Sequence, residues 1–553
     1  LLHQSVCVTL RSNPDASRKV HGLVRRFAAT GAMERGMFGY RAEIVPALWF
    51  LSQTQDCRIF ENKSTKDILQ TVFSEHGLKV SFRVGASPER SFTVQYNETD
   101  LAFVSRLMQE DGWFYWFLHD ESGHTLIVSD STGSFVKIPG GPFEPRPGDE
   151  VFTLASWHPA EVVTHGKVMM ADFDPEKPST EPHGETSTTL TASGAAMRDP
   201  FHWPARALSS DAINKVTRLK MEAAEVSAFL SHGAGFDPAF VIGGRIKVVG
   251  RQGADPKEYL LASVSHTASD NTWSNTAEPP SYSNKFTAFP ATMPWRPEQT
   301  VPRPHMEGIY SAVVIGPDGQ EIHTDKLGRV KVRFRWDRRK DATSGGAIWV
   351  RVMQAWAGGN GGWSFIPRVG TEVAVAFMDG DPERPVVVGQ LHNGDQLPPW
   401  PLPDQKTRSG LRTRSTPNGG TDDCSELSFD DKKGAEQVLL HAQRDLNVEV
   451  EHDAKHTIDN NRSVTIKQGN DTLTVQQGDI SIKAALGAIS IEAMKSLTLK
   501  VGQSSITLDQ SGVSIKGLKV QIEGQILSSL KAALVQLNAD AALKAAGGLI
   551  MLN

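Results

Sequence analysis

The last quarter of the chain carries an internal repeat that constrains the fold more than any other feature. Over residues 446–522, pairs of mostly apolar residues with one residue between them recur every seven to nine positions, centred on eight. A fixed period of this kind marks a stack of similar structural units. The pairs are Val448/Val450, His456/Ile458, Val464/Ile466, Leu473/Val475, Ile480/Ile482, Ile489/Ile491, Leu497/Leu499, Ile506/Leu508, Val513/Ile515 and Val520/Ile522.

Each repeat predicts one short β-strand with a single apolar face. The alternation within a repeat has period two, and Val, Ile and Leu supply most of its apolar members. Glycines such as Gly478, Gly487 and Gly502 fall between the pairs, where turns need a permissive backbone. The outward positions are polar, and no amphipathic helix follows that could cover the apolar face.

The uncovered apolar face predicts a homotrimer. The free energy gained by burying two apolar side chains per strand is smaller than the entropic cost of ordering the eight residues of one repeat. The inward faces are therefore expected to meet other copies, most simply in a three-sided β-prism (a β-helix of three chains) without an exposed sheet face. The expected trimer core is Val448, Val450, Ile458, Val464, Ile466, Leu473, Val475, Ile480, Ile482, Ile489, Ile491, Leu497, Leu499, Ile506, Leu508, Val513, Ile515, Val520 and Ile522.

The sequence before the repeat predicts further domains, so the fold class is mainly β and multidomain. Residues 1–304 are expected to form an α+β region with helices at 66–76, from 101 and at 211–224, and the aromatic run 113–117 is expected in its core. Residues 305–395 predict about five short strands in a small barrel of the OB-fold type. Residues 396–424 are expected to be a linker, and 425–553 the repetitive prism.

Composition narrows the class of protein further. The net charge of −5 favours neither nucleic acid nor an anionic membrane. Cys7, Cys57 and Cys424 lie far apart without CxxC spacing, which favours a reducing cytoplasm over a disulfide framework. No apolar run reaches the 18 or so residues of a membrane-spanning helix.

Two places in the repeat depart from its apolar pattern. Three copies of His456 would converge near the trimer axis and could hold a metal, an anion or ordered water. A polar layer at the base of the prism, or a slightly different register, is the alternative, and we expect no metal.

After Gly524 the sequence leaves the rhythm and becomes rich in Ala and Leu. Its apolar end predicts a docked tip protein, and the expected tip-binding residues are Leu549, Ile550, Met551, Leu552 and Asn553.

A nucleic-acid-binding barrel is one competing interpretation. The basic series is Lys331, Arg333, Arg335, Arg338, Arg339 and Lys340, and OB-folds bind nucleic acid through such faces. The acidic residues that could pair with this face lie downstream, at Asp422, Asp423, Glu426, Asp430 and Asp431. We therefore expect no nucleic-acid partner.

An enzyme is the other competing class. Residues 358–362 are glycine-rich but lack the Lys-Ser/Thr of a phosphate-binding loop, which indicates a barrel loop. Neither HExxH nor GxSxG occurs. We expect no catalytic residues and no cofactor.

A series of motifs runs through the chain in a fixed order. They are YNETD at 96–100, TDKLGRVKV at 324–332, WD at 336–337, WVRV at 349–352, WAG at 356–358, FIPRVG at 365–370, GDPERP at 380–385, FDDKKG at 429–434 and HA at 441–442. In this order they resemble the valine-glycine repeat protein G (VgrG) family, and the resemblance covers nearly the whole chain.

The resemblance implies the trimeric spike of a bacterial type VI secretion system, related to the hub and spike of contractile phage tails. It implies that residues 1–304 form a phage-hub-like region, β-barrels with helical insertions, seated on a tube of haemolysin-coregulated protein. The needle would carry a PAAR-repeat tip protein and effectors with their chaperones, and would puncture a target membrane mechanically. It also implies assembly in the bacterial cytoplasm and export without a signal peptide, into the extracellular space or a target cell. The spike of a contractile phage tail or an extracellular injection particle is an alternative with the same architecture.

Overall fold

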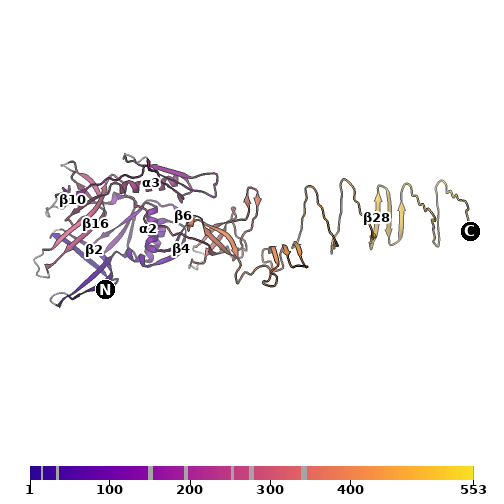
Figure 1. Cartoon of the computed structure of the whole chain (residues 1–553), viewed down its shortest axis with the longest axis horizontal. Coiled ribbons are helices and arrows are strands. Elements are labelled where there is room, and N and C mark those ends of the chain that lie inside the picture. Colours follow the sequence, from indigo (N-terminus) through magenta and orange to yellow (C-terminus); the bar gives the residue numbers. More distant parts are fainter. Residues whose placement is uncertain are drawn as a thin grey trace. The chain divides into compact units, whose positions relative to one another are not determined.

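The computed structural model divides the chain into two units, Leu1–Asn447 and Val448–Asn553. It describes residues 1–13, 16–32, 36–146, 154–191, 197–250, 254–272, 279–337 and 346–551. The first unit contains every helix of the described residues, together with most of the strands (Figure 1). The second unit, called the repeat unit below, carries the periodic sequence.

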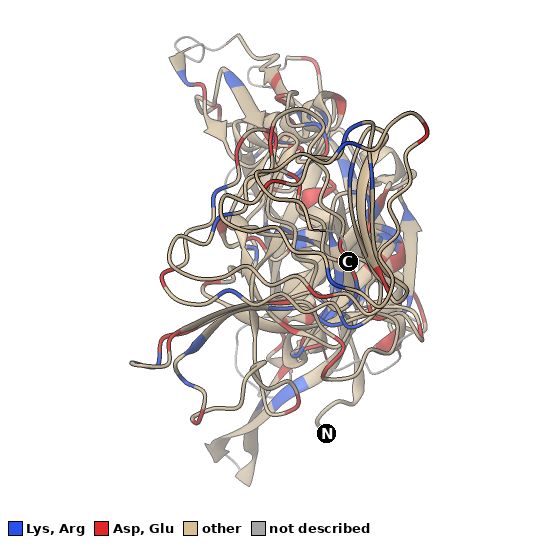
Figure 2. Ribbon diagram, turned by 90° about the vertical axis from the view of Figure 1, so that its right-hand side faces the viewer, with Lys and Arg blue, Asp and Glu red and all other residues tan. Residues whose placement is uncertain are grey.

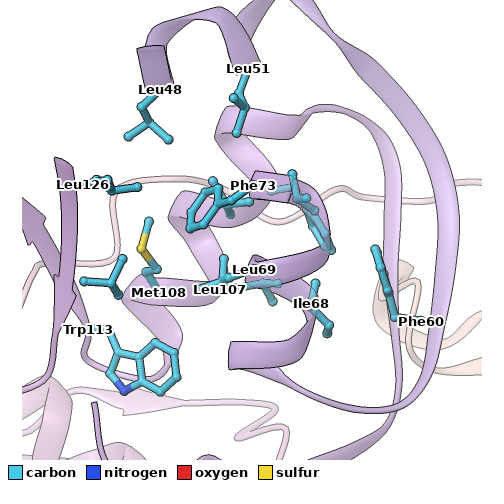
Figure 3. Packing of buried hydrophobic residues seen from close by; sticks show 14 residues of the cluster. Leu48, Leu51, Phe60, Ile68, Leu69, Phe73, Leu107, Met108, Trp113 and Leu126 are labelled. Carbon is cyan, nitrogen blue, oxygen red and sulfur yellow. The ribbon is translucent and has the colours of Figure 1, made fainter. Parts of the chain in front are cut away.

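Two short helices organise the first hydrophobic core. Helix α1 (Thr65–Glu75) begins at Ser64, whose hydroxyl accepts from the backbone N–H of Asp67 while the Asp67 carboxylate accepts from the backbone N–H of Ser64. Helix α2 (Asp100–Glu110) is capped by Thr99. The side chains between the helices point toward one another in Figure 3, where Phe73, Leu107 and Trp113 are labelled. Both helices lie where the sequence predicts them.

The aromatic run after α2 is largely core, as predicted. Strand β7 (Phe114–His119) buries Phe114 and Trp116 and leaves Tyr115 exposed. It lies in the sheet β5-β8-β7, with β5 (Val80–Arg83) and β8 (His124–Ser129). The adjacent two-stranded sheet pairs β4 (Gln55–Ser64) with β6 (Glu89–Thr99).

Three further sheets complete the N-terminal region. A three-stranded sheet is formed by β1 (Ser5–Asn13), β2 (Ala16–Ala32) and β3 (Phe38–Val45). A six-stranded sheet has the order β10 (Leu154–His158), β14 (Ser231–Gly235), β17 (Ser281–Pro290), β16 (Lys257–Ser269), β15 (Gly244–Val248) and β9 (Val136–Lys137). Helix α3 (Ser210–Ser227) packs on the third sheet, formed by β12 (His183–Ser187), β11 (Lys167–Ala171) and β13 (Phe201–His202).

A closed five-stranded barrel follows, as the sequence predicts. Its order is β18 (Tyr310–Ile315), β19 (Val330–Phe334), β20 (Ala347–Val352), β24 (Pro385–Leu391) and β23 (Glu372–Phe377). The alternate residues Val330, Val332 and Phe334 of β19 are buried. The period-two pattern of the sequence therefore becomes the barrel interior.

Two small antiparallel sheets follow the barrel. The needle-base sheet, the last part of the first unit, consists of β25 (Arg408–Arg412), β26 (Glu426–Asp430) and β27 (Gln437–His441). The repeat unit contains β28 (Ser496–Val501), β29 (Ser504–Asp509) and β30 (Gly512–Lys516). Strand β25 lies within the stretch expected from the sequence to be a linker.

Candidate assembly surfaces

The repeat unit holds its apolar pairs in register on one face. In the sheet β28-β29-β30, Leu497 pairs with Leu508 and Leu508 with Val513. The second column is Leu499, Ile506 and Ile515. The opposite face carries Thr498, Thr507 and Ser514. Two apolar columns on one side and hydroxyl groups on the other are the arrangement that the spacing predicts.

Most of the repeat finds no strand partner within its own chain. Among the described residues from 448 to 495 no strand is present, although the chain bends at 451–452, 459–460, 467–469, 476–478, 485–487 and 494–495. Figure 1 shows this stretch running back and forth. Its apolar residues, such as Val464 and Ile466, are exposed. The single chain therefore leaves the apolar face of this stretch uncovered and its backbone groups without strand pairing.

The bends continue to the end of the described chain, which corrects the expectation that the rhythm is lost after Gly524. Further bends lie at 525–526, 533, 540–541 and 548, seven to eight residues apart. Val535 and Leu537 form an exposed apolar pair between two of them. The pattern was hard to recognise in the sequence because alanine replaces larger residues, as at Ala545, and so weakens the apolar signal.

Three of the five predicted tip residues are apolar and exposed. Leu549, Ile550 and Met551 are uncovered in the single chain. Leu552 and Asn553, the other two predicted tip residues, lie outside the described residues. His456 is also exposed, two residues before Ile458. Within the described ranges, no group of three or more His, Cys, Asp or Glu side chains is arranged to hold a metal ion.

The needle-base sheet has one covered polar face and one uncovered apolar face. On the covered face Glu426 is 8% exposed and Ser428 is 1% exposed. Arg408 and Arg412 both lie within 3.7 Å of the Glu426 carboxylate. The uncovered face carries Leu411, Leu427, Leu440, Phe429 and Val438, which lie in paired positions. Sequence reasoning missed this face because β25 contributes only one apolar residue to it.

The basic series of the barrel is partly neutralised by the N-terminal region. Lys331 lies 3.8 Å from Glu61 on β4. The downstream acidic residues contact other groups instead. Asp422 and Glu426 pair with Arg412, and Asp430 accepts from Thr407. Arg338, Arg339 and Lys340 lie outside the described residues. Figure 2 shows acidic and basic residues interspersed over the ribbon.

A network of buried charges joins the barrel to the N-terminal region. Arg303, in the connection between them, lies 2.8 Å from Glu110 at the end of α2. It also lies 3.1 Å from Glu383 and 3.6 Å from Asp381, which both follow β23. Arg206 holds the other Asp381 oxygen at 2.5 Å. The GDPERP motif at 380–385 thus supplies the acidic residues of the barrel to this network of buried charges, which is called the joint below.

The pKa values of the joint follow from these contacts. Burial alone raises the pKa of Glu110, but Arg303, Arg90 and Arg106 outweigh it and hold this pKa well below its usual range. The same balance lowers the pKa of Asp381, where Arg303 and Arg206 oppose burial. Glu110 and Asp381 are therefore ionised at neutral pH. Removing Arg303 would leave these buried carboxylates with less compensating positive charge.

Histidine side chains make a second set of polar contacts, two of them to strand β2 and one to Ala47, just after β3. His119 Nδ1 accepts from the backbone N–H of His21 at 3.0 Å. His124 Nε2 accepts from the backbone N–H of Ala47 at 3.1 Å. His266 Nε2 lies 2.5 Å from Arg18 Nη1, and an arginine only donates. Each accepting nitrogen must therefore be unprotonated.

These histidines predict that the N-terminal region loses stability in mild acid. Burial, assisted by Arg18, lowers the pKa of both His119 and His266 to about 4. In the unfolded chain the pKa is near 6.5, so the unfolded state binds more protons between these values. The stability that these histidine contacts contribute is complete above pH 6.5 and is lost as the pH falls toward 4. We expect the urea concentration at the midpoint of unfolding to be lower at pH 5 than at pH 7.

Variants separate these histidines from the other titrating groups. The side chain introduced by His119→Asn can still accept a hydrogen bond but does not titrate. This variant should therefore reduce the difference in urea midpoint between pH 7 and pH 5. His441→Asn, at an exposed position on β27, should leave this difference unchanged. An unchanged difference for His119→Asn would contradict the assignment.

No helix in the described parts of the chain is both long and apolar enough to span a bilayer.

Three family models match successive parts of the chain. The phage tail baseplate hub model matches residues 1–272. The type VI secretion system/phage-baseplate injector OB domain matches residues 314–392, which contain the barrel strands. The bacteriophage T4 gp5 C-terminal trimerisation domain matches residues 409–518. The last match covers the needle-base sheet and the regular part of the repeat, and it supports a homotrimer.

Similar proteins extend across most of the chain. The type VI secretion system spike protein VgrG1a of Pseudomonas aeruginosa is 33% identical over 474 residues, which are 83% of this chain and 72% of that protein. VgrG1b of the same organism is 34% identical over 486 residues, 84% of this chain. The match spans 64% of VgrG1b, less than two thirds of its length.

A solved structure shares the fold. A chain of the Francisella PdpA-VgrG complex, in its lidded form, superposes with a TM-score of 0.51 at 9% identity. The match covers 91% of this chain and 69% of the other.

Proposed function

Because this chain belongs to the VgrG family of type VI secretion system spike proteins, which are related to phage tail hubs and spikes, we propose that three copies form a needle that crosses a target membrane under force. The observation that carries the proposal is the face of paired apolar columns, uncovered in the single chain and backed by hydroxyl groups. The apolar columns would line the trimer axis and the polar face would keep the needle soluble. This family is structural, so the act itself requires no catalytic site.

The partners follow from the two ends of such a spike. The N-terminal region, matched by a baseplate hub model, would sit on the tube of haemolysin-coregulated protein. The C-terminal end would receive a PAAR-repeat tip protein, and effectors with their chaperones would travel on the assembly. The chain would be assembled in the bacterial cytoplasm and exported by the secretion machine. We favour this machine over a phage tail or an extracellular injection particle because the similar proteins named above are type VI spikes.

The mass in solution tests the proposal directly. Light scattering should give three times the 60.3 kDa of the chain. A monomeric mass for the chain at micromolar concentration would overturn the homotrimer and the needle together.

Deleting Leu549 to Asn553 should abolish binding of a PAAR-repeat protein. These residues include the exposed apolar group Leu549, Ile550 and Met551, which a docked tip would cover. Co-purification with a tagged PAAR-repeat protein measures the loss, and light scattering should still give a trimer. Substituting Lys531→Ser, on an earlier repeat, is the control that should retain binding. Full binding by the deleted chain would contradict the tip assignment.

A further inference from the structure

A short hairpin with exposed aromatic side chains lies in the loop that connects two strands of the barrel. Strands β21 (Ala357–Gly358) and β22 (Gly361–Gly362) form it within the connection from β20 to β23. Trp356 is 62% exposed and Trp363 is 56% exposed. The Trp363 and Phe365 rings meet edge to face, with centroids 5.8 Å apart. So large an exposed aromatic surface is unusual on a protein that needs no partner there.

The hairpin holds these rings on a fixed backbone. The Trp363 N–H donates to the Trp356 carbonyl at 2.9 Å. Both ends of the Gln354 side chain bond to the Phe365 backbone at 3.2 Å. At Gly362, with a φ of 142°, an added Cβ would lie 2.6 Å from the Trp356 carbonyl oxygen, so glycine permits the tight pairing. Fixed, exposed aromatic side chains are typical of residues that dominate binding energy at interfaces.

The uncovered face of the needle-base sheet is a second apolar surface in the same unit. The chain links the two surfaces through Arg368, which comes three residues after Phe365. Arg368 donates to the Arg414 carbonyl at 2.5 Å, two residues beyond the end of β25. The Asn418 N–H in turn donates to the Glu321 carboxylate of the barrel at 2.8 Å. The barrel and the needle-base sheet are thereby tied together.

We propose that the aromatic hairpin of one copy packs against the apolar face of the needle-base sheet of a neighbouring copy. The inference rests on the proposed homotrimer. A threefold ring joins unlike surfaces head to tail, so each chain must present two different complementary patches. The hairpin and the sheet are two such patches. The sheet begins at Arg408, one residue before the trimerisation match at 409–518, so the contact would continue that interface.

Paired cysteines test the contact in the full chain. The variant Trp363→Cys/Val438→Cys, made with Cys7→Ser to remove an exposed thiol, places one thiol on each surface. Mild copper-catalysed oxidation should convert most chains to covalent dimers and trimers on a non-reducing gel. The matched control Trp203→Cys/Val438→Cys, which moves one thiol to an exposed position on the N-terminal region, should stay uncrosslinked.

The outcomes separate this contact from the homotrimer itself. Crosslinking of Trp363→Cys alone would mean that hairpins meet one another and would overturn the assignment. Absence of crosslinks in a chain that light scattering shows to be trimeric would overturn the contact and leave the proposed function standing. As a second measurement, Trp356→Ser/Trp363→Ser should raise the concentration at which trimers dissociate by at least about tenfold. An unchanged dissociation concentration would count against the contact.

Discussion

Replacing Val464 and Ile466 together by aspartate is expected to leave the chain as a monomer of 60.3 kDa. Both residues belong to the apolar face and are exposed in the single chain, at 63% and 45%. In the proposed trimer they lie near the axis, where three copies would bring six carboxylates together. Burying ionised groups without partners costs far more than the apolar contacts at one level contribute. Light scattering and sedimentation measure the result.

The residue between these two supplies the control. Thr465 lies on the polar side of the alternation, so Thr465→Asp should remain trimeric at neutral pH. A trimer from the double aspartate variant, or a monomer from Thr465→Asp, would mean that the faces are assigned the wrong way round. The first unit should keep its circular dichroism signal in both variants, because it closes its own cores.

Arg303→Met is expected to destabilise the first unit by about 3–5 kcal/mol, the usual effect of removing one partner from a buried ion cluster. Arg303 contacts Glu110, Glu383 and Asp381, and the Asp381 side chain is only 1% exposed. Without Arg303, desolvation is less well opposed, and the pKa values of Glu110 and Asp381 rise. The loss should therefore be largest at neutral pH and smaller in acid. Urea unfolding at pH 7 measures it.

Two further variants distinguish the charge from the packing. Arg218→Met removes an exposed pair, 3.8 Å from Glu222, and should change the free energy of unfolding by less than about 1 kcal/mol. Arg303→Met/Glu383→Met should recover part of the loss, because it also removes a carboxylate that Arg303 pairs with at 3.1 Å. If Arg303→Met behaved like Arg218→Met, the joint would not depend on this network.

Local patterns in the sequence were sufficient for much of the fold. The sequence predicted a helix at 66–76, and α1 spans Thr65–Glu75 behind the capping box at Ser64. Alternation in β19 predicted which barrel residues are buried. The repeat spacing predicted the apolar columns of β28 to β30, because a period of two fixes the face of every residue. These features depend on neighbours within a few positions.

Features built from distant residues could not be predicted. Arg303 and Glu110 lie nearly two hundred positions apart, so nothing in either local sequence marks them as partners. The aromatic hairpin was predicted only as a glycine-rich barrel loop, since exposure depends on what the rest of the chain leaves uncovered. The pairing of Glu426 with Arg408 and Arg412, within its own sheet, also differs from the expected pairing with the barrel.

The contrast between the two units has a kinetic consequence. The first unit encloses its own hydrophobic cores, so it can fold as soon as it has been synthesised. The repeat unit has uncovered apolar columns and long stretches without backbone partners. Its ordering must therefore wait for an encounter between chains. In the proposed trimer, once the first strands of three chains have paired, the high effective concentration of the remaining repeats makes further strand registration a zippering step that no longer depends on protein concentration.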